Sequence, residues 1–397
     1  MSTIPSAKSY SDVGGALVVK NRMILLVIFV VALLTTCGTC AALTEEEQQL
    51  EELGRLLYFD TDLSTPAGQS CASCHEPTAG FADPDSELPV SQGVLPQNRF
   101  GNRNSPTAAY AKFSPEFGPI TENDETLYVG GQFWDGRAKD LVEQAKGPFL
   151  NPLEMNNPSK LAVIVKIKNS EYADIFEKVT RVNLKDLSKS NVEKAYNEAA
   201  IAIAAYESSA EVNPFSSKYD AYVDEDPDAL NDTEKWGLEL FNGKAMCSQC
   251  HPSEPGLYAD KALFTDYTYD NLGTPKNPDN PFYDLPKKFN PAGANFIDYG
   301  LGGILKADDE MGKFKVPTLR NIAVTSPYMH NGVFDDLEEV VNFYNTRDVD
   351  PNWPAPEVDK NINKDELGDL ELSGEEVKAI VAFMETLTDG YYKPAET

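Results

Sequence analysis

The stretch Cys71-Ala72-Ser73-Cys74-His75, matched in form by Cys247-Ser248-Gln249-Cys250-His251, decides how this chain folds. In a C-x-x-C-H motif the two thiols form thioethers with the porphyrin edge, and the following imidazole reaches the iron from one face. Two such motifs in one chain predict two covalently bound haem c groups. Two disulfides or a zinc site are the alternative, which is disfavoured because a histidine directly follows both pairs.

Each motif follows a short stretch with the pattern of an amphipathic helix. Leu53-Gly54-Arg55-Leu56-Leu57-Tyr58-Phe59 precedes the first motif, and Trp236-Gly237-Leu238-Glu239-Leu240-Phe241 precedes the second. These loose copies predict two similar haem domains that meet near residues 208–230. We therefore divide the chain into a leader at 1–42, an N-terminal haem domain at 43–212 and a C-terminal haem domain at 213–397.

Helical periodicity dominates the rest of the chain. It indicates helices near 139–147, 159–168, 171–179, 191–207, 335–346 and 374–388, while strand signals are few. Capping boxes at Thr44-x-x-Glu47 and Ser373-x-x-Glu376 predict two helix starts. Residues 252–315 hold many Pro, Gly, Asn and Asp residues and predict a long ordered loop region. The expected fold is mostly α, with two cytochrome c-like haem domains, long ordered loops and a domain interface between the haems.

The first 42 residues have the pattern of a secretion signal. The apolar run Met23–Leu34 follows Lys20 and Arg22, is short for a membrane span, and is followed by small residues. We therefore expect a periplasmic or otherwise extracytoplasmic protein, with Met23 as an alternative start. Leu34-Thr35-Thr36-Cys37 resembles a lipoprotein cleavage box, so a lipid anchor on Cys37 and simple cleavage near Ala41 both stay open.

The net charge of −29 limits the classes of partner. So acidic a surface repels nucleic acid and anionic membranes, and it favours a basic partner such as a cationic electron-carrier protein. General solubility outside the cytoplasm explains the same charge equally well.

The histidine count limits the ligands of the two irons. The chain has three histidines, and the two motifs use His75 and His251, which leaves His330. At most one haem can therefore be bis-histidine, and the other must use Met, Tyr, another donor, water or nothing. An iron with an open position can bind peroxide or oxygen, whereas two fully ligated haems would only pass electrons. The count alone favours an enzyme modestly.

Outside the motifs, the sequence resembles the bacterial dihaem cytochrome c peroxidase and MauG superfamily, over roughly residues 45–388. The stretches that carry this resemblance are Arg103-Asn-Ser-Pro-Thr107, Gln132-Phe-Trp-Asp-Gly-Arg-Ala138, Leu141-Val-Glu-Gln-Ala145, Asn151-Pro-Leu-Glu-Met155, Phe314-Lys-Val-Pro-Thr-Leu-Arg-Asn321 and Thr325-Ser-Pro-Tyr-Met-His-Asn-Gly332.

The resemblance implies that the two haems have different functions. The haem held by Cys71, Cys74 and His75 would be peroxidatic, and the haem held by Cys247, Cys250 and His251 would transfer electrons. Glu154 matches the acid–base carboxylate of the family, which would take a proton from peroxide and return it to the leaving oxygen.

Three further residues match the family near the first haem. Gln144 matches a polar residue that would orient peroxide or water, and Pro148 matches a residue that shapes the same pocket. Trp134 matches the indole that lies between the two haems and carries the electron. In isolation, a lone Glu is usually on the surface and a lone Trp is usually in the core.

Two positions place the chain in the MauG-like subgroup. Residues 76–130 contain no histidine, so the peroxidatic haem is predicted to be open in the resting state. Tyr344 matches the distal ligand of the second haem, where typical peroxidases have Met and MauG-like proteins have Tyr; ligation by Met311 or Met329 stays the alternative. His330 matches a residue that hydrogen-bonds near the propionates of the second haem.

The resemblance also implies a calcium ion between the domains. Its ligands would be the Asn104 side chain, the backbone carbonyls of Thr325 and Pro327, and waters, and such oxygen donors suit Ca²⁺.

The leading hypothesis is an exported dihaem c-type peroxidase. It would reduce hydrogen peroxide at the open N-terminal haem with electrons from a small cytochrome c or a cupredoxin. The first alternative is a MauG-like enzyme that uses peroxide-derived oxidising equivalents on residues of a protein substrate. The second alternative is a non-enzymatic electron-transfer cytochrome.

Overall fold

A computed structural model describes residues 43–95, 98–122, 125–224 and 226–391. The leader, with its predicted signal and the proposed lipid site at Cys37, lies outside these residues, so both remain predictions. In the described part of the chain, no helix is both long enough and apolar enough to cross a membrane.

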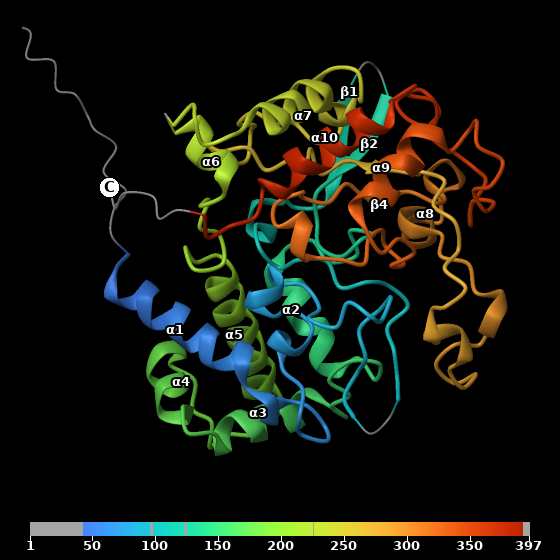
Figure 1. The fold of residues 1–397 in the computed structure, drawn as a ribbon. Helices are drawn as coiled ribbons and strands as arrows, with labels where there is room; N and C mark the ends of the chain where they lie inside the picture. The colour runs from blue at the N-terminus through green and yellow to red at the C-terminus, as the bar shows by residue number, and fades with distance from the viewer. Residues whose placement is uncertain (1–42, 96–97, 123–124, 225, 392–397) are drawn as a thin grey trace, which may run out of the picture. The chain divides into compact units, whose positions relative to one another are not determined.

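The described chain is mostly helical and has few strands, which confirms the expected class (Figure 1). The helices are α1 (Glu45–Phe59), α2 (Leu141–Leu150), α3 (Lys160–Asn169), α4 (Ala173–Thr180), α5 (Lys189–Glu207), α6 (Lys218–Val223), α7 (Asp232–Asn242), α8 (Gly300–Leu305), α9 (Leu337–Thr346) and α10 (Gly374–Glu385). The strands form two antiparallel pairs, β1 (Gly118–Glu122) with β2 (Glu125–Val129) and β3 (Tyr269–Asp270) with β4 (Phe314–Lys315).

The predicted helices occur within a few residues of their expected ends, and both helix starts predicted from capping boxes are confirmed. Thr44 and Ser373 both form capping boxes at α1 and α10. The hairpin β1–β2 occurs where no element was predicted. Helix α6 lies within the predicted junction at 208–230, and residues 252–315 contain mainly loops and short helical turns, as expected.

The same helix crossing is built twice in the chain. Helix α1 packs on α5, and a Cβ on Gly54 would lie 1.8 Å from the Ala202 carbonyl oxygen. Helix α7 packs on α10, and a Cβ on Gly237 would lie 1.9 Å from the Ala379 carbonyl oxygen. In both pairs the glycine allows the backbones to touch, and the C-terminal end of α1 or α7 leads the chain toward a C-x-x-C-H motif (Figure 1).

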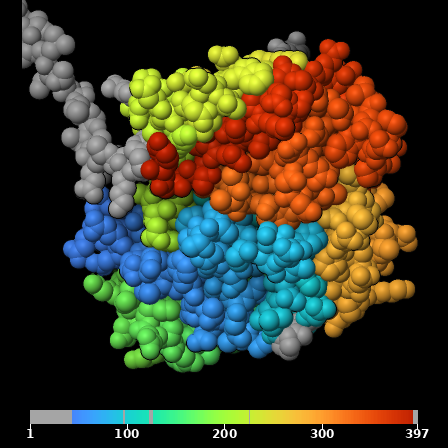
Figure 2. Space-filling view, in the orientation of Figure 1, coloured from blue at the N-terminus to red at the C-terminus, as the bar shows by residue number. Residues whose placement is uncertain are grey.

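The buried apolar side chains form two main clusters. The first draws on residues 53–212 and on Leu263 and Tyr267, whereas the second draws on residues 219–387. In Figure 2 the C-terminal red segment lies against the yellow-green segment that contains α6 and α7. This separation favours two haem domains, while their boundary at 212/213 remains a prediction.

The carboxyl of Glu207 near the end of α5 predicts a pH-dependent stability. Its Oε2 has no hydrogen-bond partner among the described residues, and burial raises its pKa from 4.5 to about 8. The folded protein therefore holds a proton that the unfolded chain releases above pH 4.5, so stability declines as the pH rises from 4.5 to about 8.

We expect Glu207→Gln to remove this decline. At pH 8 the variant should gain up to about 4 kcal/mol in the free energy of unfolding, and at pH 4 it should gain almost nothing. Urea unfolding at the two pH values measures the difference. An equal effect of the substitution at both pH values would contradict the raised pKa.

Candidate haem and peroxide sites

Both motifs have the same local structure. The short helical turns Cys71–Ser73 and Cys247–Gln249 carry the cysteines, and each histidine follows directly. The Nδ1 atom of His75 lies 3.2 Å from the carbonyl oxygen of Phe81, and the Nδ1 atom of His251 lies 2.8 Å from that of Phe264. Burial lowers the pKa of both imidazoles, that of His251 to about 4. Each ring is therefore neutral and oriented, with Nε2 available for an iron, so the residues present fit haem c.

A pair of equivalent threonine hydrogen bonds, one in each half of the chain, holds the backbone next to these carbonyls. This repeat was not predicted from the sequence. The hydroxyl of Thr107 donates to the Gly80 carbonyl, and the hydroxyl of Thr318 donates to the Leu263 carbonyl, both at 2.6 Å. Gly80 and Leu263 directly precede the two phenylalanines that orient the histidines. The available signal was the pair Pro-Thr, present at residues 106–107 and 317–318. A dipeptide is too short to stand out without the fold.

Glu154 lies in a pocket beside the first motif. The pocket has a volume of about 390 Å³, which is ample for peroxide and several waters, and it is also lined by Phe133, Arg137, Glu143 and Pro148. The amide of Asn151 donates to Oε1 of Glu154 at 2.8 Å. Burial raises the pKa of Glu154, although the charge of Arg137 opposes the shift. The charge of Glu154 contributes to raising the pKa values of the Cys71 and Cys74 thiols, after the larger effect of burial.

The structure brings together some of the predicted pocket residues and not others. Glu154 and Pro148 line the same pocket, and Pro148 lies within α2. Gln144, one turn earlier on α2, is half-buried and is not among the residues that line this pocket. Arg137 and Phe133 line the pocket and were not predicted as site residues; the guanidinium of Arg137 lies 3.6 Å from the centre of the Phe133 ring.

A larger cavity adjoins the second motif. Its lining includes Cys247, Cys250, His251, Tyr344 and Trp134. Burial, followed by the charges of the two cysteines, raises the pKa of Tyr344, which places its phenol close to the motif. Met329 lines this cavity as well, whereas Met311 does not.

Trp134 lies at the junction of the two sites. Its indole Nε1 donates to the Asn104 carbonyl at 2.9 Å. The preceding residue, Phe133, lines both the Glu154 pocket and the cavity of the second motif. Phe133 is therefore shared by the two sites, and Trp134 follows it directly in the lining of the second cavity.

His330 also lines the second cavity. Its ring stacks on Phe314 with 3.6 Å between centroids, and its Nε2 has no hydrogen-bond partner in the described part of the chain. Oε2 of Glu357 lies 4.0 Å from this nitrogen. A buried ring nitrogen without a partner fits the predicted contact with a haem propionate.

The three predicted calcium ligands line the same cavity. Asn104, Thr325 and Pro327 contribute to this lining from two distant segments of the chain. Among the described residues, no hydrogen bond to the carbonyl oxygens of Thr325 and Pro327 is present. An amide oxygen with two carbonyls fits the preference of Ca²⁺ for oxygen donors.

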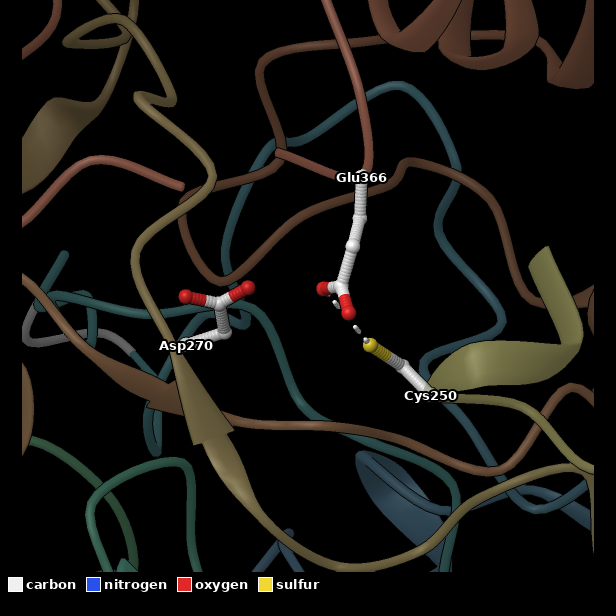
Figure 3. Close-up of side chains that lie close together, drawn as sticks. All are labelled: Cys250, Asp270 and Glu366. Atoms are coloured by element: carbon white, nitrogen blue, oxygen red, sulfur yellow. Dashed lines mark hydrogen bonds between the residues drawn. The ribbon is translucent and has the colours of Figure 1, made fainter. Parts of the chain in front are cut away.

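Two carboxylates flank the second motif. Figure 3 shows Asp270 and Glu366 beside Cys250, whose sulfur lies 3.9 Å from Oε2 of Glu366. The amide of Asn363 donates to both carboxylates, at 2.5 and 2.7 Å. Because Cys250 is a haem-attachment cysteine, we interpret this cluster as the acidic edge of the haem site and not as a separate metal site.

Two partly buried C-x-x-C-H motifs, each with an oriented imidazole, define a class: c-type cytochromes with two haem-attachment sites. Residues 48–228 match the family of the di-haem cytochrome c peroxidases. MauG, the methylamine utilization protein of Paracoccus denitrificans, is 38% identical over 366 residues, which cover 88% of this chain and 90% of MauG. The cytochrome c551 peroxidase of Nitrosomonas europaea is 32% identical over 346 residues, covering 87% of this chain and 82% of the peroxidase.

The fold points to the same proteins. The crystal structure of the diheme peroxidase BthA from Burkholderia thailandensis matches with a TM-score of 0.73 and 32% identity, covering 87% of this chain and 88% of BthA. The chain therefore belongs to the dihaem cytochrome c peroxidase and MauG family, and it is a dihaem oxidoreductase.

Proposed function

We propose that the protein is an extracytoplasmic dihaem peroxidase that reduces hydrogen peroxide beside the first motif. The observation that supports this proposal is the pocket lined by Glu154, whose pKa is raised by burial. The effect of the Glu154 charge on the Cys71 and Cys74 thiols supports a position close to the first motif. A carboxyl whose pKa is raised by burial is better suited to acid–base catalysis than one with its ordinary pKa. Electrons would reach this pocket from the second motif through Trp134.

Each residue of the pocket has a different role in the proposed reaction. Haem, when bound at His75, supplies the redox chemistry. The carboxylate of Glu154 takes a proton from hydrogen peroxide and returns it to the departing oxygen, so that water leaves. Asn151 fixes one carboxylate oxygen by its hydrogen bond of 2.8 Å, and Pro148 and Phe133 bound the space that peroxide occupies. Gln144 would have to act from outside this lining.

A MauG-like activity is the second candidate function, favoured by one observation at the second motif. Tyr344 lines the cavity there, where its phenol oxygen is suited to hold the iron. Burial disfavours the phenolate, so a nearby cation would have to stabilise it. The absence of histidine between residues 76 and 130 supports the same candidate, as does the similarity to MauG. The substrate would then be a protein side chain.

The remaining components of the proposal follow from charge and donor chemistry. The net charge of −29 favours a basic electron donor, either a small cytochrome c or a cupredoxin, and disfavours nucleic acid. We propose calcium at Asn104, Thr325 and Pro327, a haem interface near Trp134, and a periplasmic location with Cys37 as an optional lipid site.

Electron paramagnetic resonance of the ferric protein tests the proposal. We expect one high-spin and one low-spin signal, and stoichiometric hydrogen peroxide should change both. Turnover with reduced cytochrome c would support the peroxidase, and a long-lived oxidised state that ignores cytochrome c would support the MauG-like candidate. Two low-spin signals that do not respond to peroxide would leave only electron transfer and would refute both enzymes.

The ligand at the second haem gives a separate prediction. Tyr344→Phe should change the absorption spectrum of that haem and raise its reduction potential, by on the order of 0.1 V, because an anionic oxygen donor stabilises ferric iron. Met329→Leu is the matched control, since Met329 lines the same cavity. A spectrum that responds to Met329→Leu and not to Tyr344→Phe would reverse the assignment.

A further inference from the structure

Two tyrosines connect the cavity of the second motif with the protein surface. Tyr267 is 4% exposed and lines the cavity, whereas Tyr258 is 38% exposed. Their ring centroids are 5.7 Å apart at an angle of 69°. The residue before Tyr258, Leu257, is 94% exposed, so the outer ring lies in a segment that solutes can reach.

The hydroxyl of Tyr267 has no structural role in the described part of the chain. It is buried and has no hydrogen-bond partner there. A buried hydroxyl without a partner costs free energy, and phenylalanine would fill the same space without that cost. The backbone of Tyr267 also adopts the left-handed region, with φ of 62°, which is unfavourable for an aromatic residue. Packing alone therefore does not account for a tyrosine at this position.

A basic group adjoins the Tyr267 ring. The Nζ atom of Lys315 lies 6.0 Å from the ring centre, and it donates to the Gly131 carbonyl at 2.5 Å. Burial lowers the pKa of Lys315 to about 7, although the charge of Asp135 opposes the shift. The backbone N–H of Lys315 donates to the Trp134 carbonyl at 2.8 Å, which links the backbone of this lysine to that of Trp134.

We propose that Tyr267 and Tyr258 form a relay through which electrons from small phenols at the surface enter the cavity of the second motif. This inference rests on the proposed peroxide reduction, which supplies the oxidant. The relay would give the enzyme a second class of reductant that needs no docked protein. A phenol suits it because its reduction potential is close to that of tyrosine.

The electrons and protons of the relay balance as follows. Reduction of one hydrogen peroxide to two waters requires two electrons and two protons. For each electron, Tyr267 gives up an electron to the cavity. Its phenolic proton passes to the neutral amine of Lys315 once the flexible lysine side chain turns its Nζ from its position 6.0 Å from the ring centre toward the hydroxyl. Tyr267 regains both the electron and the proton when Tyr258 supplies the next electron. Tyr258 releases its own proton to water and becomes a neutral phenoxyl radical. A small phenol in contact with Tyr258 returns one hydrogen atom, so two phenols are oxidised to phenoxyl radicals for each peroxide.

Spin trapping tests the relay on the intact dihaem protein. The protein is treated with one equivalent of hydrogen peroxide and a nitroso spin trap, and the adducts are located by peptide mass spectrometry while peroxide loss is recorded. We expect the main tyrosine adduct on Tyr258. Tyr267→Phe should reduce this adduct at least tenfold, without changing the absorption spectra of the haems. Tyr299→Phe is the matched control, since Tyr299 is 43% exposed and makes no ring contact among the described residues.

The outcomes separate the relay from the proposed function. Loss of the Tyr258 adduct in Tyr267→Phe, with the adduct retained in Tyr299→Phe, supports the relay. Peroxide loss without an adduct on Tyr258, or an adduct that survives Tyr267→Phe, refutes the relay and leaves the peroxidase intact. No peroxide loss in the unaltered protein refutes both.

Discussion

Glu154→Gln is expected to lower the rate of peroxide reduction by about 10²- to 10⁴-fold. The amide has nearly the shape of the carboxyl and can still contact Asn151, but it cannot accept a proton and release it again. The binding of small ligands beside the first motif should change much less than the rate. Stopped-flow measurement of peroxide decay, with both haem spectra recorded, separates the two effects.

Glu143→Gln is the matched control for this prediction. Glu143 lines the same pocket, but it is exposed and pairs with Lys146 at 2.9 Å. We expect its substitution to change the rate less than about twofold, as is usual for a surface ion pair. Because the working form of Glu154 is the carboxylate, activity should also fall as the pH drops through its raised pKa. If the Glu154→Gln variant kept a tenth or more of the original rate, the carboxyl of Glu154 would have no essential role in the mechanism.

Arg320→Met should lower the free energy of unfolding by about 3–5 kcal/mol. The Arg320 side chain is fully buried and makes a double hydrogen bond to Asp220 on α6, at 2.8 and 3.0 Å. Its Nε also donates to the Ala262 carbonyl at 2.7 Å. Methionine would leave the carboxylate of Asp220 buried without its partner. Denaturant unfolding monitored by circular dichroism measures the loss.

Two variants complete the Arg320 experiment. Arg181→Ala removes an ion pair to Glu46 that is almost fully exposed, so it should cost less than about 1 kcal/mol. The double variant Arg320→Met with Asp220→Asn should recover part of the loss, because the amide carries no charge. A loss in Arg320→Met no larger than in Arg181→Ala would show that the buried pair does not stabilise the fold.

The features that the sequence predicted well depend on residues close together in the chain. The haem motifs, the capping boxes at Thr44 and Ser373 and the apolar spacing of α5 each lie within one element. The choice of Tyr344 over Met311 or Met329 used only the spacing along one helix and stays a prediction, because Tyr344 and Met329 both line the cavity. The role of Glu154, predicted from a stretch of five residues that resembles a known family, likewise stays a prediction.

The features that were missed depend on contacts between distant segments. Nothing near Gly54 in the sequence indicates that it lies against Ala202, and the unpartnered carboxyl of Glu207 looks like any polar residue at the end of a helix. Gln144 shows a limit of family resemblance. It matches a pocket position of the family, but it is not among the residues that line the pocket. The hairpin β1–β2 was missed because its short strands have only weak alternation.

The doubled glycine crossing has a consequence for how the protein matures. In each half, the helix just before the haem motif packs against a helix that is synthesised much later. Helix α1 packs against α5, and helix α7 packs against α10. A chain that emerges from its N-terminus therefore presents Cys71 and Cys74 before Ala202 has arrived to close the crossing. The order of synthesis thus leaves the cysteines of each motif accessible for haem attachment before the later helix packs against the earlier one.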